Sequence, residues 1–180
     1  MDTIELKGLT FRVEIKHDDS LGCPWDEHDG HGPVRNISAD DPKAPGERVM
    51  YKARHRQWLY DHAEAMRIAK RDVWGMSDED RAAFKKNTGR EPTPGEIALA
   101  AVQRDFDHLR GFASGEWGWC GVVVTLLDVD GNATDETESL WGIESNSYDY
   151  HKEVARELAG DIARRVGRKK YITKRIKVRT

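Results

Sequence analysis

The sequence contains no long hydrophobic run. No stretch approaches the ~18 consecutive apolar residues that mark a membrane-spanning helix. The first sixteen residues alternate charged and apolar side chains, and they have neither the basic start nor the continuous apolar core of a signal peptide. These absences predict a cytoplasmic protein with no membrane partner.

Cysteine is also scarce, and several common catalytic signatures are missing. The only two cysteines, Cys23 and Cys120, lie far apart in the chain, which favours free thiols over a disulfide. We find no paired CxxC, no phosphate-binding P-loop, no Rossmann glycine pattern and no nucleophile elbow. We therefore expect no organic cofactor, and a metal ion is the one cofactor that the residues leave open.

The composition is that of a polar globular protein. Of 180 residues, 38% are hydrophobic and 34% are charged, and six tryptophans supply bulky core material. This length suits one domain. We predict a single domain over residues 1–167, followed by a basic tail or edge strand over residues 168–180.

The charges are distributed unevenly along the chain. Nine basic residues and no acidic one lie between Arg164 and Thr180, whereas the first 163 residues hold 20 basic and 32 acidic residues. The tail could form an edge strand over Tyr171–Val178, protected from pairing by its charges. It could instead bind nucleic acid, although the acidic body would repel a polyanion. The candidate nucleic-acid-binding residues are Arg168, Lys169, Lys170, Lys174, Arg175 and Lys177.

Two segments have the hydrophobic pattern of strands. Apolar and polar residues alternate over Leu9–Ile15, which is typical of a half-buried antiparallel strand. Trp117–Leu127 is apolar at both parities, which indicates a central strand. A turn at Asp130–Asn132 then allows Ser139–Glu144 to return as the hairpin partner.

Helix signals separate these strands. Asp61 and Ser77 are predicted N-caps, and Thr93 followed by Pro94 and Glu96 is a complete capping signature. The apolar stripe of the helix after Asp61 extends through Val73, and Gly75 is expected to end this helix. A last helix is expected over residues 148–166, ended by Gly167. The fold class we predict is α+β: an antiparallel sheet of about three to five strands with three or four helices packed against it.

The segment Asp18–Glu47 is long and has no helical or strand period. Such a loop inside a small domain is usually functional. We predict that it contacts a partner macromolecule. The alternative is that the loop folds on itself, with Trp25 as an apolar anchor. The candidate partner-binding residues are Trp25, Glu27, His28, Asp29 and His31.

The same segment could hold a metal ion. Imidazole, carboxylate and thiolate groups are ligands for transition metals, and His28, Asp29 and His31 lie within four residues of each other. Cys23 could complete the set. No ligand spacing here matches an established zinc motif, so we keep a metal-dependent hydrolase or nuclease as an alternative function.

Three segments resemble small, uncharacterised proteins of tailed phages and prophages: the run from Pro24 to Gly32, the run from Pro45 to Arg48, and the run from Ser139 to Ser145. The resemblance implies a phage-encoded accessory protein in the bacterial cytoplasm. It favours binding of a host macromolecule over catalysis. The partner it implies is a host protein or a protein–nucleic acid complex, for example a component of an anti-phage defence system that the protein inhibits. It transfers no catalytic residue.

Overall fold

The computed structural model describes residues 2–177, with side-chain surroundings as far as residue 167. Within this range it contains seven strands in two antiparallel sheets and five helices, which confirms the α+β class. Within the fold, the chain divides into two compact units. Unit 1 comprises Met1–Leu21 and Trp117–Thr180, and unit 2 comprises Gly22–Glu116.

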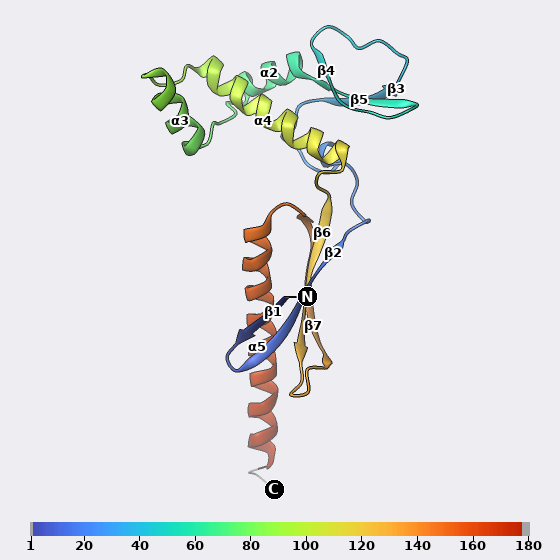
Figure 1. The fold of residues 1–180 in the computed structure, drawn as a ribbon. Helices are drawn as coiled ribbons and strands as arrows, with labels where there is room; N and C mark the ends of the chain where they lie inside the picture. The colour runs from blue at the N-terminus through green and yellow to red at the C-terminus, as the bar shows by residue number, and fades with distance from the viewer. Residues whose placement is uncertain (1, 178–180) are drawn as a thin grey trace. The chain divides into compact units, whose positions relative to one another are not determined.

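Unit 1 is one sheet with one helix. Its strands follow the order β1-β2-β6-β7 and are antiparallel throughout. The helix α5 lies along one face of this sheet (Figure 1). The elements are β1 (Asp2–Leu6), β2 (Leu9–His17), β6 (Trp119–Leu127), β7 (Ala133–Glu144) and α5 (Tyr148–Lys177).

The core of unit 1 lies between this helix and the sheet. Phe11, Val122 and Val124 of the strands meet Val154 and Ile162 of α5, and all five are at most 2% exposed. Both predicted strands are confirmed: Leu9, Phe11 and Val13 of β2 pack in the core, although Ile15 is exposed, and β6 is buried along nearly its whole length. The hairpin turn and its return strand are confirmed as well, although β7 begins six residues earlier than predicted.

The end of unit 1 differs from the prediction. The helix α5 does not stop at Gly167 but continues to Lys177, so the expected edge strand over Tyr171–Val178 is helical as far as the structure describes it. A glycine inside a helix costs only about 1 kcal/mol. The lysines and arginines around it are good helix formers, and no proline interrupts the run.

Unit 2 combines a small sheet with four helices among its described residues. The strands follow the order β3-β5-β4. The core forms where β5 meets α2 and α4, around Tyr60, Ala65, Val102 and Leu109. The elements are α1 (Pro24–Glu27), β3 (Val34–Ser38), β4 (Glu47–Lys52), β5 (Arg56–Asp61), α2 (His62–Arg71), α3 (Asp78–Thr88) and α4 (Pro94–Ser114).

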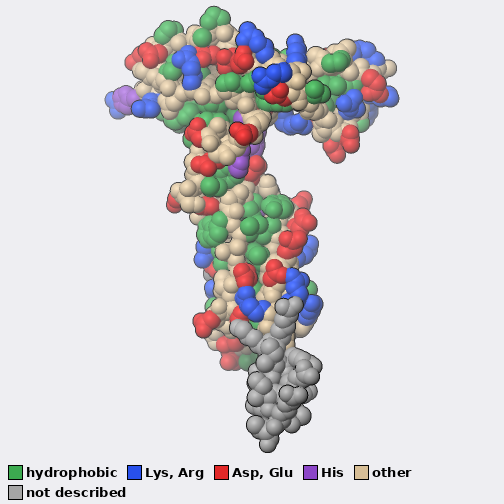
Figure 2. Space-filling view, turned by 180° about the vertical axis from the view of Figure 1, so that it is seen from behind, with side chains coloured by type: hydrophobic (Ala, Val, Ile, Leu, Met, Phe, Trp, Pro, Cys, Tyr) green, Lys and Arg blue, Asp and Glu red, His purple; other side chains and the backbone are tan. Residues whose placement is uncertain are grey.

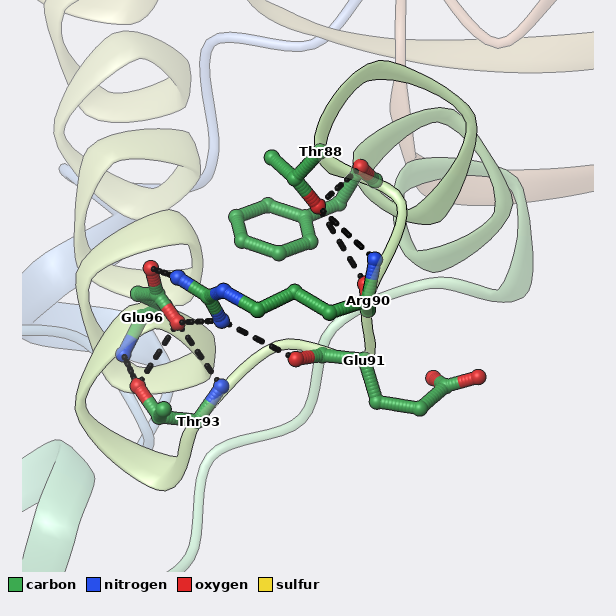
Figure 3. Close-up of polar contacts among 6 residues, drawn as sticks. Thr88, Arg90, Glu91, Thr93 and Glu96 are labelled. Carbon is green, nitrogen blue, oxygen red and sulfur yellow. Dashed lines mark hydrogen bonds and ion pairs between the residues drawn. The ribbon is translucent and has the colours of Figure 1, made fainter.

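The predicted helix starts in unit 2 are confirmed. Asp61 and Ser77 each accept a hydrogen bond from a backbone N–H of the first turn. At α4 the capping box between Thr93 and Glu96 is complete, and Arg90 adds two hydrogen bonds to the Glu96 carboxylate (Figure 3). The start of α4 is therefore encoded within seven residues.

The end of α2 was predicted wrongly. The apolar stripe was extended through Val73 to Gly75, but the helix ends at Arg71 and Val73 has a left-handed backbone with φ of 53°. Its side chain is 83% exposed. A β-branched residue in this conformation is strained.

The segment Asp18–Glu47 is also more ordered than predicted. It contains the short helix α1 and the strand β3, which pairs with β5. No helix that the structure describes has the length and apolar content needed to cross a membrane.

Candidate functional site

The candidate site is an exposed loop that begins in α1. We define the α1 loop as residues 26–30, all of which are exposed. Pro24 starts the helix and is buried, and Trp25 packs edge-on against Phe112 of α4, with ring centroids 5.8 Å apart. The Glu27 carboxylate folds back and accepts a hydrogen bond of 3.0 Å from the Gly22 N–H. The first end of the loop is thereby fixed to unit 2.

A carboxylate on α4 fixes the second end of the loop. Asp105 accepts three hydrogen bonds: 2.6 Å from His31 Nδ1, 2.8 Å from the Gly32 N–H and 2.7 Å from the Tyr60 hydroxyl. The Asp105 side chain is only 10% exposed. Two of its three donors belong to the chain directly after the α1 loop, so Asp105 holds this chain against the core.

Tyr60 makes this second anchor tight. Burial, and then the Asp105 carboxylate, raise the pKa of the Tyr60 phenol far above its ordinary value, so the hydroxyl stays a donor. A Cβ atom at Gly32 would overlap the Tyr60 ring, which means that only glycine lets the chain pass at this point. The His31 ring stacks on the ring of His108, with centroids 6.0 Å apart.

The exposed part of the loop is acidic. Asp26, Glu27 and Asp29 place three carboxylates within four residues, with no lysine or arginine among them. Unit 2 as a whole is nearly balanced, with 17 acidic and 15 basic residues, and Figure 2 shows both signs intermingled over it. The α1 loop is therefore a local concentration of negative charge on a mixed surface.

The five predicted partner-binding residues fall into two groups. Trp25 and His31 are partly buried and act as anchors, as the alternative of a loop that folds on itself predicted. Glu27, His28 and Asp29 are exposed between these anchors. The ends of the loop are therefore internal and its middle is exposed, and contact of this middle with a partner stays a prediction.

The structure does not gather the four candidate metal ligands. Among the described residues, no group of three or more histidine, cysteine or acidic side chains is arranged to hold a metal ion. His31 is turned toward Asp105, whereas His28 and Asp29 face solvent. Burial, and next the charges of Asp26 and Glu27, raise the pKa of the Cys23 thiol and disfavour the thiolate that binds metals.

A second histidine site lies in unit 1 but has the wrong geometry for nucleophilic catalysis. The Cys120 sulfur is 3.5 Å from His151 Nε2, and the same nitrogen is 2.9 Å from the Glu144 carbonyl oxygen. A carbonyl oxygen can only accept, so Nε2 carries the proton and cannot take one from the thiol. Burial raises the pKa of Cys120, which packs as a small apolar side chain.

The third candidate surface falls outside what the structure describes. Residues 168–177 form the last turns of α5, and their side chains lie outside the described residues. These side chains include the basic residues that we predicted to bind nucleic acid: Arg168, Lys169, Lys170, Lys174, Arg175 and Lys177.

Sequence reasoning missed the residue that organises the site. Asp105 lies in the apolar stripe of α4, because it follows Val102 by three residues and precedes Leu109 by four. A carboxylate in a buried stripe needs hydrogen-bond partners. That signal predicts a buried polar contact at Asp105, although it does not tell which loop supplies the donors.

No protein-family model matches the chain, and neither a curated protein nor a solved structure is detectably similar to it. The function is therefore inferred from the geometry of the α1 loop and its anchors.

Proposed function

We propose that this chain is a phage-encoded accessory protein that binds a host macromolecule through the α1 loop, without catalysing a reaction. The observation that carries the proposal is the pair of anchors on either side of an exposed acidic segment. Trp25 packs on Phe112 before the loop, and Asp105 binds His31 and Gly32 after it. Only the segment between the anchors is left to solvent.

Such an arrangement favours binding for an entropic reason. A loop that is disordered before binding loses conformational freedom when it binds, and this loss reduces affinity. Anchoring both ends reduces the loss, because the loop already has a defined path. The three carboxylates would then meet a basic partner surface without a large rearrangement.

The charge of the loop suggests the class of partner. Proteins that bind nucleic acid carry basic surfaces, and anti-phage defence components that act on DNA or RNA belong to this class. An acidic loop can occupy such a surface in place of the phosphate backbone. We therefore propose a nucleic-acid-binding defence component of the bacterial host as the partner.

The test begins with affinity capture from a lysate of the bacterial host, followed by calorimetric titration with the purified partner. The decisive variant is Asp26→Asn, Glu27→Gln and Asp29→Asn, in which Glu27→Gln keeps the oxygen that accepts from Gly22. We expect its affinity to fall about tenfold or more, which corresponds to about 1.4 kcal/mol.

The matched control also removes three exposed carboxylates, but from unit 1: Asp130→Asn, Glu153→Gln and Glu157→Gln. Its affinity should stay within about threefold of wild type, because distant exposed charges contribute little. An equal loss in both variants would show that overall charge, and not the α1 loop, controls binding. Retention of full affinity by the loop variant would refute the proposal directly.

A further inference from the structure

Unit 1 has a groove between the first turns of α5 and the strands β1 and β2, where the helix does not fully cover the sheet. Along β2, the side chains that face α5 go from fully buried at Phe11 to 49% exposed at Ile15. The groove has a volume of about 210 Å³. Ile4, Val13, Ile15 and Ala155 form its apolar part.

Two cations lie at this groove, in the part of unit 1 before Arg164, which is otherwise acidic. Over residues 1–21 and 117–163, unit 1 has 15 acidic and only five basic residues. Lys152 and Arg156 are the only two basic residues between Trp117 and Ala163, and both line the groove. Asp2 is the single acidic residue of the lining.

These cations are available to a partner. Lys152 pairs with Asp149, but both side chains are largely exposed, at 66% and 99%. An exposed pair of this kind is weak and exchanges easily. Arg156 is exposed and forms no ion pair or hydrogen bond with the residues whose side chains the structure describes.

The size of the groove distinguishes between classes of occupant. Pockets for free small molecules usually enclose about 300–1,000 Å³. A volume of about 210 Å³ is smaller and suits one or two apolar side chains of another protein. Tyr148 stands beside it with 71% exposure, and aromatic residues of this kind are enriched at protein interfaces.

We infer that this groove is a docking site for an acidic segment of a partner protein. An apolar side chain of the segment enters between Val13, Ile15 and Ala155, and a neighbouring carboxylate contacts Lys152 and Arg156. The site lies wholly in unit 1 and uses no residue of the α1 loop. It is therefore a second interaction surface, independent of the proposed function.

The test uses three capped hexapeptides as probes for the full chain. One combines Leu-Phe with acidic flanks (Glu-Asp-Leu-Phe-Glu-Glu), one has the same apolar pair with lysine flanks, and one has acidic flanks around Gly-Ser. Methyl signals of Ile4, Val13 and Ile15 in nuclear magnetic resonance spectra report on the groove. We expect the acidic apolar peptide to shift these signals and to bind at least about tenfold more tightly than either of the others.

Two matched double variants locate the charge effect. The variant Lys152→Gln, Arg156→Gln should bind the acidic apolar peptide with about tenfold lower affinity. The control variant Lys7→Gln, Lys16→Gln removes two cations of the same unit that lie outside the groove, and it should change this affinity less than about threefold. Ile15→Thr, a change at a half-exposed position, should also weaken binding and should leave the circular dichroism spectrum intact.

Several outcomes would overturn the inference. Equal binding of the lysine-flanked peptide, equal losses in the two double variants, or unmoved methyl signals would each do so. Self-association in light scattering that disappears in the Lys152→Gln, Arg156→Gln variant would assign the groove to a second copy of this chain instead. The α1-loop variant should bind the peptide like wild type, so failure of this inference leaves the proposed function untouched.

Discussion

The two units of this chain are stabilised in different ways. Unit 1 is held by an apolar layer between long strands and one long helix, with Phe11, Val122 and Ile162 fully buried. Unit 2 has short strands, and its chain between Gly22 and Glu47 is held by the pairing of β3 with β5, by the packing of Trp25, and by single polar side chains that each accept or donate several bonds. Asp105 is one of these polar centres, and Glu47 and Gln57 are two more.

Glu47 shows how such a centre works. It is 7% exposed, receives both ends of the Arg35 guanidinium and accepts a bond from the Ala44 N–H. The Arg35 guanidinium, followed by the Ala44 N–H and the Arg35 charge, holds the pKa of Glu47 below its ordinary value against the opposing effect of burial. Gln57 likewise donates to the carbonyl groups of Ser38 and Asp41. Unit 2 thus adds polar contacts to the apolar packing that orders this part of its chain.

The largest difference between the units should appear on removal of Asp105. Asp105→Ala leaves three donors without their acceptor, two of them from the segment after the α1 loop. We expect a loss of about 3 kcal/mol in the free energy of unfolding of unit 2. Hydrogen exchange, measured separately for the two units, should show faster exchange around Gly32 and an unchanged unit 1.

Asp105→Asn serves as the conservative control for this prediction. Its amide oxygen can accept from Gly32 and Tyr60, and its NH2 group can donate to Nδ1 of a neutral His31. The free energy of unfolding of Asp105→Asn should therefore recover at least half of the loss caused by Asp105→Ala. If Asp105→Ala itself left exchange around Gly32 unchanged, the carboxylate would not be an anchor.

Relief of backbone strain should give the next largest change in the free energy of unfolding, and this change should be a stabilisation. Over residues 2–177, each unit holds one residue other than glycine at positive φ, Val73 in unit 2 and Lys7 in unit 1. Val73→Gly should stabilise unit 2 by about 1 kcal/mol, because glycine adopts this conformation without a steric cost. Lys7→Gly should stabilise unit 1 less, since lysine is not β-branched. Urea denaturation measures both, and no gain at Val73 would mean that its side chain makes stabilising contacts.

The pH dependence of unit 2 should include a contribution from Glu96. Hydrogen bonds from Arg90, followed by those from Thr93, lower the pKa of Glu96 from 4.5 to about 2 (Figure 3). The ionised carboxylate is favoured in the folded state, so its stabilisation is complete above pH 4.5 and is lost as the pH falls toward 2. Glu96→Gln should therefore reduce the slope of stability against pH in this range. An unchanged slope would contradict the assignment.

The smallest effect is expected for the main ion cluster of unit 1. Arg165 on α5 bonds to Glu136 and Glu138 of β7, and all three side chains are between 22% and 38% exposed. Solvent screens such contacts. Arg165→Gln should lower the unfolding midpoint by far less than Asp105→Ala does, and 1 M salt should remove most of the difference. A loss as large as that of Asp105→Ala would erase the distinction between the two units.

The accuracy of the sequence predictions follows the same division. In unit 1 the strand pattern over Leu9–Ile15 and the doubly apolar Trp117–Leu127 were predicted correctly, because every residue repeats the same local signal. In unit 2 the capped helix starts were predicted correctly, because the residues that form a cap lie within one turn of each other. Predictions were wrong where a long-range contact or a single backbone angle decides, as in the segment after Asp18 and at Val73.

The candidate site shows where this limit lies. The sequence identified Trp25, His28 and His31 as unusual residues of one segment, and it favoured contact with a partner. It did not show that Trp25 and His31 face inward while His28 faces outward. That distinction depends on Asp105 and Phe112, which lie more than 70 residues further along the chain.

The sequence by itself determined the α+β class, the starts of α2, α3, α4 and α5, and three of the strands of unit 1 (β2, β6 and β7), because periodicity and capping act between neighbouring residues. Only the tertiary structure decided that the chain forms two units, that the α1 loop is anchored at both ends, and that Lys152 and Arg156 lie at one groove. These features arise from contacts between distant segments, and the pattern of neighbouring residues carries no information about which distant partner is chosen.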